Sequence, residues 1–190
     1  LWQEIAENFY PERADFTVNR TLGEDFASHL TSSYPVMVRR ELGNTIASML
    51  RPRSMPWFSI SVADEDRISV EARRWLQWAT GVQRRAMYDP EALFIRATSE
   101  GDQDYATFGQ TVISREVDLS RNTLLYRCWH LRDVAWCESY RGDIDTIYRK
   151  WKPCARELVN YFGRDKVSED TQRKADKLDL NPIVCIHAIL

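Results

Sequence analysis

Hydrophobic residues in the first half of the chain recur mainly at helical spacing. They predict a first helix that Pro11 ends, a second helix over 23–33, and a third that has Pro35 in its first turn. The longest helix is expected to run from the acidic stretch 64–66 to about Met87. Its predicted apolar stripe consists of Ile68, Ala72, Trp75, Ala79, Val82 and Ala86.

Other stretches of the first half are shorter. Residues 57–62 alternate between apolar and polar side chains and predict a short strand. Two short helices are expected over 91–99 and 102–108, because Gly101 interrupts the pattern and Gly109 ends it. In the third helix the apolar positions recur at fours, at Val38, Leu42, Ile46 and Leu50.

Beyond residue 110 the apolar residues alternate with polar ones, which is the period of a β-strand. A turn is predicted at 140–143. Two short helices are expected late in this half, one opened by Pro153 and ended by Gly163, the other capped by Ser168. Strands are predicted over 111–118, 123–133, 134–140 and 143–151, and from 182 to the end of the sequence.

Helices that precede an antiparallel meander define an α+β fold class. We divide the chain into a mainly helical part, 1–110, and a β-meander with two short helices, 111–190. Both ends of the sequence fall within predicted elements, so we expect one continuous fragment of a longer protein. A length of 190 residues is enough to bury a hydrophobic core.

The charge of the chain is nearly balanced, with 26 Lys and Arg against 28 Asp and Glu. This balance gives no overall electrostatic support for wrapping nucleic acid. Arg73 and Arg84 lie three helical turns apart on the predicted long helix, so they share a face that could contact nucleic acid. A solvated helix face is the simpler interpretation of the pair. No apolar run approaches the roughly 20 residues of a membrane span.

Residues that could carry chemistry are few. Cys128, His130 and Cys137 are spaced so that zinc binding is conceivable, but buried free thiols in a reducing compartment are the simpler interpretation. Asp143 and Asp145 share a strand face and could act as paired metal ligands, or they could cap turn amides. The three histidines lie in apolar segments, where hydrogen-bonded core or interface roles are typical.

Sequence motifs for phosphate binding, a nucleophile elbow or a zinc protease are absent. We therefore predict no catalytic residue, cofactor or metal, and we expect that the chain is not an enzyme. Two alternatives stay open. One is a metal-dependent nuclease or phosphotransferase that uses Asp143, Asp145 and a distant partner, and the other is a nucleic-acid-binding module that uses Arg73 and Arg84.

Three blocks of sequence carry a family resemblance. Residues 54–58, SMPWF, follow a long predicted helix, and residues 105–113, YATFGQTVI, end a helix in Phe-Gly and lead into a strand. Residues 138–163 form a turn, an alternating strand, and a helix that Gly163 ends. In their order and rough spacing, over essentially the whole chain, these blocks resemble the portal (head-to-tail connector) proteins of short-tailed, T7-like bacteriophages.

This resemblance implies a structural subunit of a ring, usually of twelve copies, at one vertex of the capsid. Double-stranded DNA enters through the ring, driven by a separate terminase, and leaves through it at infection. The implied partners are further copies of the chain, capsid and scaffold proteins, terminase, tail adaptor proteins and the DNA in the channel. The protein would be made in the host cytoplasm and located in the virion. The chain would correspond to the wing, before most of the stem and clip.

A ring built from head-to-tail contacts presents two different surfaces on each subunit. The sequence contains seven tryptophans, more than a lone domain of this size requires. We therefore predict that some of them lie at subunit contacts. The candidates are Trp57, Trp75, Trp78, Trp129, Trp136 and Trp151.

Overall fold

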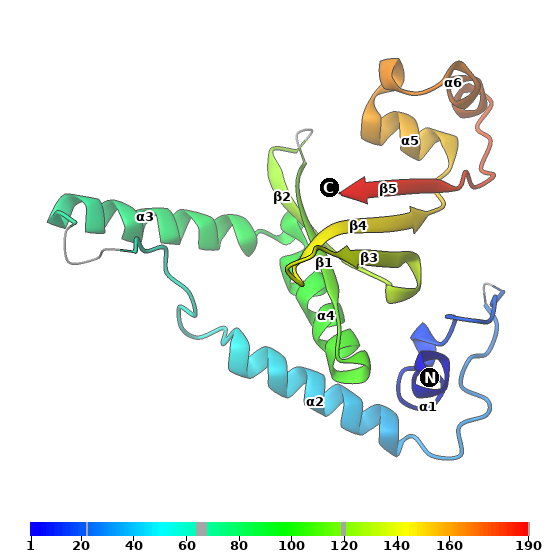
Figure 1. The fold of residues 1–190 in the computed structure, drawn as a ribbon, viewed down its shortest axis with the longest axis horizontal. Coiled ribbons are helices and arrows are strands. Elements are labelled where there is room, and N and C mark those ends of the chain that lie inside the picture. The colour runs from blue at the N-terminus through cyan, green and yellow to red at the C-terminus, as the bar shows by residue number, and fades with distance from the viewer. Residues whose placement is uncertain (22, 64–67, 119–120, 190) are drawn as a thin grey trace. The chain divides into compact units, whose positions relative to one another are not determined.

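The computed structural model describes residues 1–21, 23–63, 68–118 and 121–189 (Figure 1). The chain forms two compact units, Leu1–His130 and Leu131–Leu190. Their boundary lies beyond the change of hydrophobic period at residue 110, so the first antiparallel strand pair belongs with the helices. Helices followed by antiparallel strands confirm the α+β class.

The first unit contains four α-helices and one pair of strands among its described residues. Two short 3₁₀ helices also belong to this unit. The first, η1 (Pro11–Arg13), follows the first α-helix, and the second, η3 (Pro90–Ala92), precedes the fourth. The α-helices are α1 (Trp2–Phe9), α2 (Tyr34–Leu50), α3 (Val70–Met87) and α4 (Phe94–Phe108). The predicted stop before Pro11, the placement of Pro35 in a first turn and the end of the longest helix at Met87 are all confirmed.

Ser69 caps the start of α3, since its Oγ accepts a hydrogen bond from the Ala72 backbone N–H at 3.1 Å. The predicted acidic start at 64–66 lies outside the described residues. The predicted stripe of α3 is partly wrong. Trp75 and Val82 are exposed, whereas Leu76 is half-buried and Met87 is buried.

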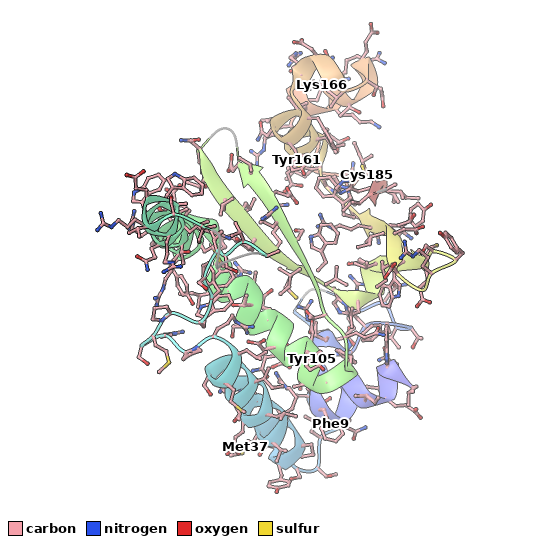
Figure 2. The ribbon with its side chains drawn as sticks, turned by 60° about the vertical axis from the view of Figure 1, so that its left-hand side comes forward. Phe9, Met37, Tyr105, Tyr161, Lys166 and Cys185 are labelled. Carbon is pink, nitrogen blue, oxygen red and sulfur yellow. The ribbon has the colours of Figure 1, made fainter. Side chains whose placement is uncertain are left out.

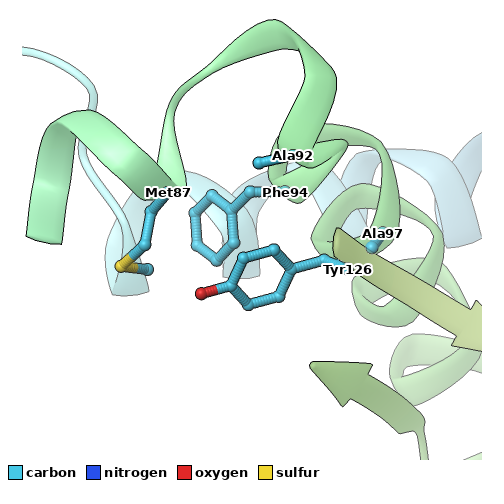
Figure 3. Packing of buried hydrophobic residues seen from close by; sticks show 5 residues of the cluster. All are labelled: Met87, Ala92, Phe94, Ala97 and Tyr126. Carbon is cyan, nitrogen blue, oxygen red and sulfur yellow. The ribbon is translucent and has the colours of Figure 1, made fainter. Parts of the chain in front are cut away.

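The first sheet pairs β1 (Val112–Asp118) with β2 (Thr123–Trp129) in antiparallel register. Its β2 strand packs against the core of the unit, where Phe94 lies between Met87 and Tyr126 (Figure 3). The Phe94 ring makes edge contacts with Tyr88 and Tyr126 at centroid distances of 5.3 and 5.0 Å. The buried cluster consists of Met87, Ala92, Phe94, Ala97 and Tyr126.

The helix predicted over 23–33 is wrong. These residues form turns and bends, and Phe26 is exposed. Asp25 Oδ1 accepts a hydrogen bond from the Ala27 backbone N–H at 3.0 Å, a local bond that competes with helical pairing. A His29 ring nitrogen lies 3.1 Å from the Glu7 carbonyl oxygen, so the segment is bound to α1 by a side chain instead.

The strand predicted over 57–62 is also wrong within the described residues. The segment is extended, but it joins neither sheet, and its Ile60 backbone N–H donates to Thr80 Oγ1 on α3 at 2.9 Å. Alternation of apolar residues here reflects contact with α3 and with the Phe94 core, against which Trp57 and Phe58 pack.

Gly101 does not interrupt the helix, so the two short helices predicted around it are one continuous α4. A Cβ atom at this position would come within 2.8 Å of Ile113 Cδ1 and Thr111 Oγ1. The glycine therefore allows β1 to approach α4 closely. The predicted stop at Gly109 is confirmed, with φ at +72°.

The second unit contains a separate sheet, so the strands do not form one meander. Its order is β3-β4-β5, all antiparallel. The predicted strand over 123–133 ends at Trp129 and is followed by a 3₁₀ turn, η4 (Leu131–Asp133). The elements are β3 (Val134–Glu138), β4 (Ile144–Trp151), α5 (Ala155–Phe162), η5 (Arg164–Lys166), α6 (Glu169–Asp176) and β5 (Cys185–Ile189).

Local rules predicted the ends of these elements well. The turn between β3 and β4 closes through the Ser139 backbone N–H and the Asp143 carbonyl oxygen at 2.8 Å, with Gly142 at a φ of +84°. Ser168 Oγ accepts from the Thr171 backbone N–H at the start of α6, and Gly163 ends α5. These predictions are confirmed.

Three consecutive residues of α4 each bind an arginine from a different place in the first unit. Asp102 pairs with Arg51 directly after α2, and Gln103 Oε1 accepts from Arg39 in the middle of α2 at 2.9 Å. The third residue, Asp104, pairs with Arg13 of η1 at 3.3 Å. Since neighbouring helix residues point about 100° apart, this triplet holds α2 and the N-terminal segment on different sides of α4.

Asp104 is 1% exposed, and Cys128 Sγ donates to its Oδ2 at 3.4 Å. Burial raises the pKa of the Asp104 carboxyl, and the nearby Arg13 charge opposes this rise. The buried Arg39 side chain has partners besides Gln103. It donates to the Phe9 carbonyl oxygen at 3.1 Å, and its guanidinium lies 3.8 Å from the centroid of the Tyr10 ring.

Replacing Asp104 by Ala should lower the free energy of unfolding of the first unit by about 2–4 kcal/mol, because Arg13 would lose its buried partner. The matched control is Arg96→Ala, which removes the exposed Arg96–Glu100 pair on the same helix. That change should cost about 0.5 kcal/mol or less. Urea unfolding of the 190-residue chain measures both, and equal losses would contradict the assignment.

The raised pKa of Asp104 has a defined effect on the pH dependence of stability. The folded state binds the Asp104 proton more tightly than the unfolded state does. The associated stabilisation is complete below the unfolded pKa and is lost as the pH rises through the folded pKa. Wild-type stability should therefore rise relative to Asp104→Asn on acidification through that window. Urea titrations at several pH values measure the difference, and an opposite slope would be contrary to this prediction.

Candidate assembly surfaces

The residues proposed for metal chemistry do not form a site. Within the described residues, no group of three or more His, Cys, Asp or Glu side chains could hold a metal ion. Cys128 is bonded to Asp104, and His130 Nε2 lies 2.7 Å from Asp15 Oδ1. His130 therefore has the hydrogen-bonded role that is typical of histidines in apolar segments.

Asp143 and Asp145, the acidic pair at the β3–β4 turn, are both exposed. The turn amide of Arg141 is capped by Ser139 Oγ at 3.1 Å, not by either carboxylate, which corrects the proposed capping role. The pair has no third acidic or histidine ligand among the described residues.

A cavity of about 550 Å³ lies between the second half of α2 and α4. Its charged lining includes Asp102 and Arg51, which are already paired with each other. The described lining residues include no histidine, cysteine or lysine. The one carboxylate among these described lining residues, Asp102, is bound by the Arg51 guanidinium.

The four cysteines are free, as predicted, but they are not all buried. Burial, followed by the Asp104 charge, raises the pKa of the Cys128 thiol to about 12. Cys137 is exposed, and Cys128, Cys154 and Cys185 are half-buried.

The six candidate tryptophans divide into two groups. Trp129 is 4% exposed, and Trp57 stacks on Phe94 while its indole N–H donates to Tyr88 Oη at 3.0 Å. In the second unit, Trp136 and Trp151 are half-buried. By contrast, the other two lie on the surface of α3 and are far from buried, Trp75 at 61% and Trp78 at 60% exposed.

Trp75 and Trp78 form a pair, with ring centroids 6.4 Å apart. Two arginines that the sequence reasoning missed lie on the same side of the helix, because Arg74 precedes Trp78 by four residues and Arg85 follows it by seven. All of these side chains are exposed. We call Arg74, Trp75, Trp78, Val82 and Arg85 the α3 face.

The predicted arginine pair lies on a different side of α3. Arg84 is half-buried, and its guanidinium lies 3.5 and 3.4 Å from the carbonyl oxygens of Arg53 and Met55. Arg73 is exposed on the same flank. A nucleic-acid contact through these two residues stays a prediction. The spacing of Arg74, Trp78 and Arg85 was the pattern that could have identified the exposed face.

A second exposed surface follows α2. Of the apolar positions predicted at fours, Val38, Leu42 and Leu50 are exposed and Ile46 is half-buried, whereas Arg39 and Gly43 are the buried residues of the helix. Met37 is exposed near them (Figure 2). We call Tyr34, Val38, Glu41, Leu42, Thr45 and Met49, which share one flank of the helix and are all exposed, the α2 face.

Exposed apolar helix faces are typical of a protein that assembles with others. No described helix is both long and apolar enough to span a membrane. The comparison with known families defines the same class, a structural protein that assembles with others. The chain belongs to the family of bacteriophage head-to-tail connecting proteins, whose family model matches residues 1–190.

One curated relative is the "Probable portal protein" of Bordetella phage BPP-1, which is 23% identical over 194 aligned residues. The alignment covers 99% of this chain and 34% of the relative. The chain therefore spans about a third of the length of the relative that it matches. The family resemblance drawn from the three sequence blocks is confirmed.

The cysteines should differ sharply in reactivity. In variants that keep only Cys128 or only Cys137, a thiol–disulfide reagent at neutral pH should label Cys137 at least about 100-fold faster, because the half-buried Cys128 thiol, with its high pKa, forms little thiolate. The release of the reagent's chromophore gives both rates. Equal rates in the folded chain would contradict the protected environment of Cys128, and unfolding in urea should remove the difference.

Proposed function

We propose that this chain is part of a structural subunit of a phage portal ring, the connector between head and tail. The observation that carries the proposal is the presence of two different exposed apolar helix faces on one compact unit. The match to the connecting-protein family and the likeness to a relative named as a portal protein support it.

The geometry of a ring explains why two faces are needed. In a head-to-tail ring every subunit uses one surface to contact the neighbour on one side and a different surface on the other side. The α3 face and the α2 face are different in composition, since one is rich in tryptophan and arginine and the other in aliphatic side chains. Each would be covered in the assembly, which removes apolar surface from water.

The finer parts of the proposal follow from the portal role. The ring would contain about twelve copies at one capsid vertex and would form the channel for packaging and ejection of double-stranded DNA. Capsid and scaffold proteins, terminase and tail adaptor proteins would contact it. The subunit would be made in the host cytoplasm and would end in the virion. A net charge of −2 suits a channel that lets DNA slide without gripping it.

Full-length protein should form rings in negative-stain images, with a matching mass by light scattering. The double change Trp75→Ala and Trp78→Ala should raise the concentration needed for assembly by about 30-fold or more, because truncating a buried interface tryptophan costs about 2 kcal/mol or more. Gln77→Ala, an exposed position on another side of α3, is the control.

A monomeric full-length protein would refute the ring. Unchanged assembly of the tryptophan variant would remove the α3 face from the interface but leave the ring. Magnesium-dependent cleavage of DNA that Asp143→Asn abolishes would favour the nuclease alternative over the structural role.

A further inference from the structure

We infer that the α3 face of one copy packs on the α2 face of a neighbouring copy. This inference rests on the proposed ring, and it names the two helix surfaces that form the contact. It also assigns the charges that set their pairing, Arg74 and Arg85 on one side and Glu41 on the other.

The α3 face combines a large apolar area with net positive charge. Glu71 is exposed on the same side, seven residues before Trp78, and Arg74 and Arg85 outnumber it. The Trp75 and Trp78 rings contact each other and are still more than half exposed. Arg74 and Arg85 lie on either side of Trp78 along the helix, and neither has a carboxylate within 4.0 Å in the described parts of the chain. In its native complex this face requires an apolar surface that also supplies negative charge.

The α2 face has these properties. Tyr34, Val38, Leu42 and Met49 recur every four to seven residues on one flank, and Glu41 is the charged residue among them. The neighbouring Arg40 lies about 100° around the helix from Glu41, and both line a shallow hollow that Thr45 also lines. No described basic side chain lies within ion-pair distance of the Glu41 carboxylate.

The two helices also match in size. The α2 helix has 17 residues and α3 has 18, so each is about 26 Å long. Rows of side chains four residues apart, such as Tyr34, Val38 and Leu42 on α2 and Arg74, Trp78 and Val82 on α3, are the ridges that interlock when two helices pack. In this contact the side chains of both rows would bury their apolar parts, and Arg74 and Arg85 would reach the Glu41 carboxylate at the edge.

A second copy of the chain is the occupant that the charges favour. The α3 helix carries four arginines and one glutamate, in a chain whose acidic residues outnumber its basic ones. Both faces belong to the first unit and both are exposed there, so neither satisfies the other within one chain. Nucleic acid would suit the arginines, but it would leave the aliphatic α2 face and Glu41 without a partner.

Charge reversal in the full-length protein tests the pairing. One variant carries Arg74→Glu and Arg85→Glu, and the other carries Glu41→Arg. Each alone should need at least about tenfold more protein to form rings, because like charges would meet at the contact. The matched control is Arg73→Glu, on the other flank of α3, and it should assemble normally.

Restoration is the decisive result. A chain with all three changes, and an equimolar mixture of the two defective variants, should both form rings within about threefold of the wild-type concentration, since opposite charges meet again. Circular dichroism of each variant separates loss of contact from loss of fold. If a reversal variant does not fold, the milder single variants Arg85→Gln and Glu41→Gln replace it, and each should weaken assembly.

The outcomes separate this inference from the proposed function. If wild-type protein forms no ring, the proposed function fails. If wild-type rings form and both reversal variants assemble as readily, or neither combination restores assembly, the pairing is refuted while the ring stands. If the α3 reversal leaves rings intact but weakens binding of a fluorescent DNA duplex, nucleic acid is the partner of this face, and the inference is overturned.

Discussion

The buried contact between Asp104 and Arg13 is the constraint on which the first unit depends. A charged pair in an apolar interior costs desolvation, so it stabilises the fold only when its geometry is held in place. Here Cys128 supplies a further hydrogen bond, and the neighbouring Gln103 binds Arg39 of α2. Polar contacts therefore hold the N-terminal segment and α2 on α4. Because each contact needs specific partners, it fixes the position of these segments along α4 more strictly than aliphatic packing alone would.

This polar attachment explains the unusual surface of α2. The side of the helix that faces α4 carries Arg39 and Gly43, and Gly43 leaves room for the Gln103 side chain, whose nearest atom would lie 2.4 Å from an added Cβ. Because polar contacts occupy much of the inward side, apolar residues such as Val38, Leu42 and Met49 lie exposed on the outer flank. Polar contacts thus fix α2 in place, while its exposed apolar flank is available to another molecule.

Periodicity and end rules predicted much of the fold. Pro35, Gly109 and Ser168 act through backbone geometry or a local cap, so their effect could be read without knowing the tertiary structure. Gly101 was misjudged, since its role depends on the distant Ile113. Trp75 was placed on the wrong side of its helix, because Leu76 and Met87, not Trp75, are the residues that α3 buries or half-buries. The spacing of Arg74, Trp78 and Arg85 could have indicated the α3 face, whereas the α2 face became clear only when the structure showed that Arg39 and Gly43 are the buried residues of that helix.

The way α3 is attached decides what its tryptophans can do. Met87 fixes the end of the helix in the core, and two further contacts precede it, Thr80 with the Ile60 amide and Arg84 with the Arg53 and Met55 carbonyl oxygens. Trp75 lies twelve residues before Met87, which is about 18 Å along the helix. A neighbouring molecule can therefore cover the tryptophan pair without touching the core that holds the helix.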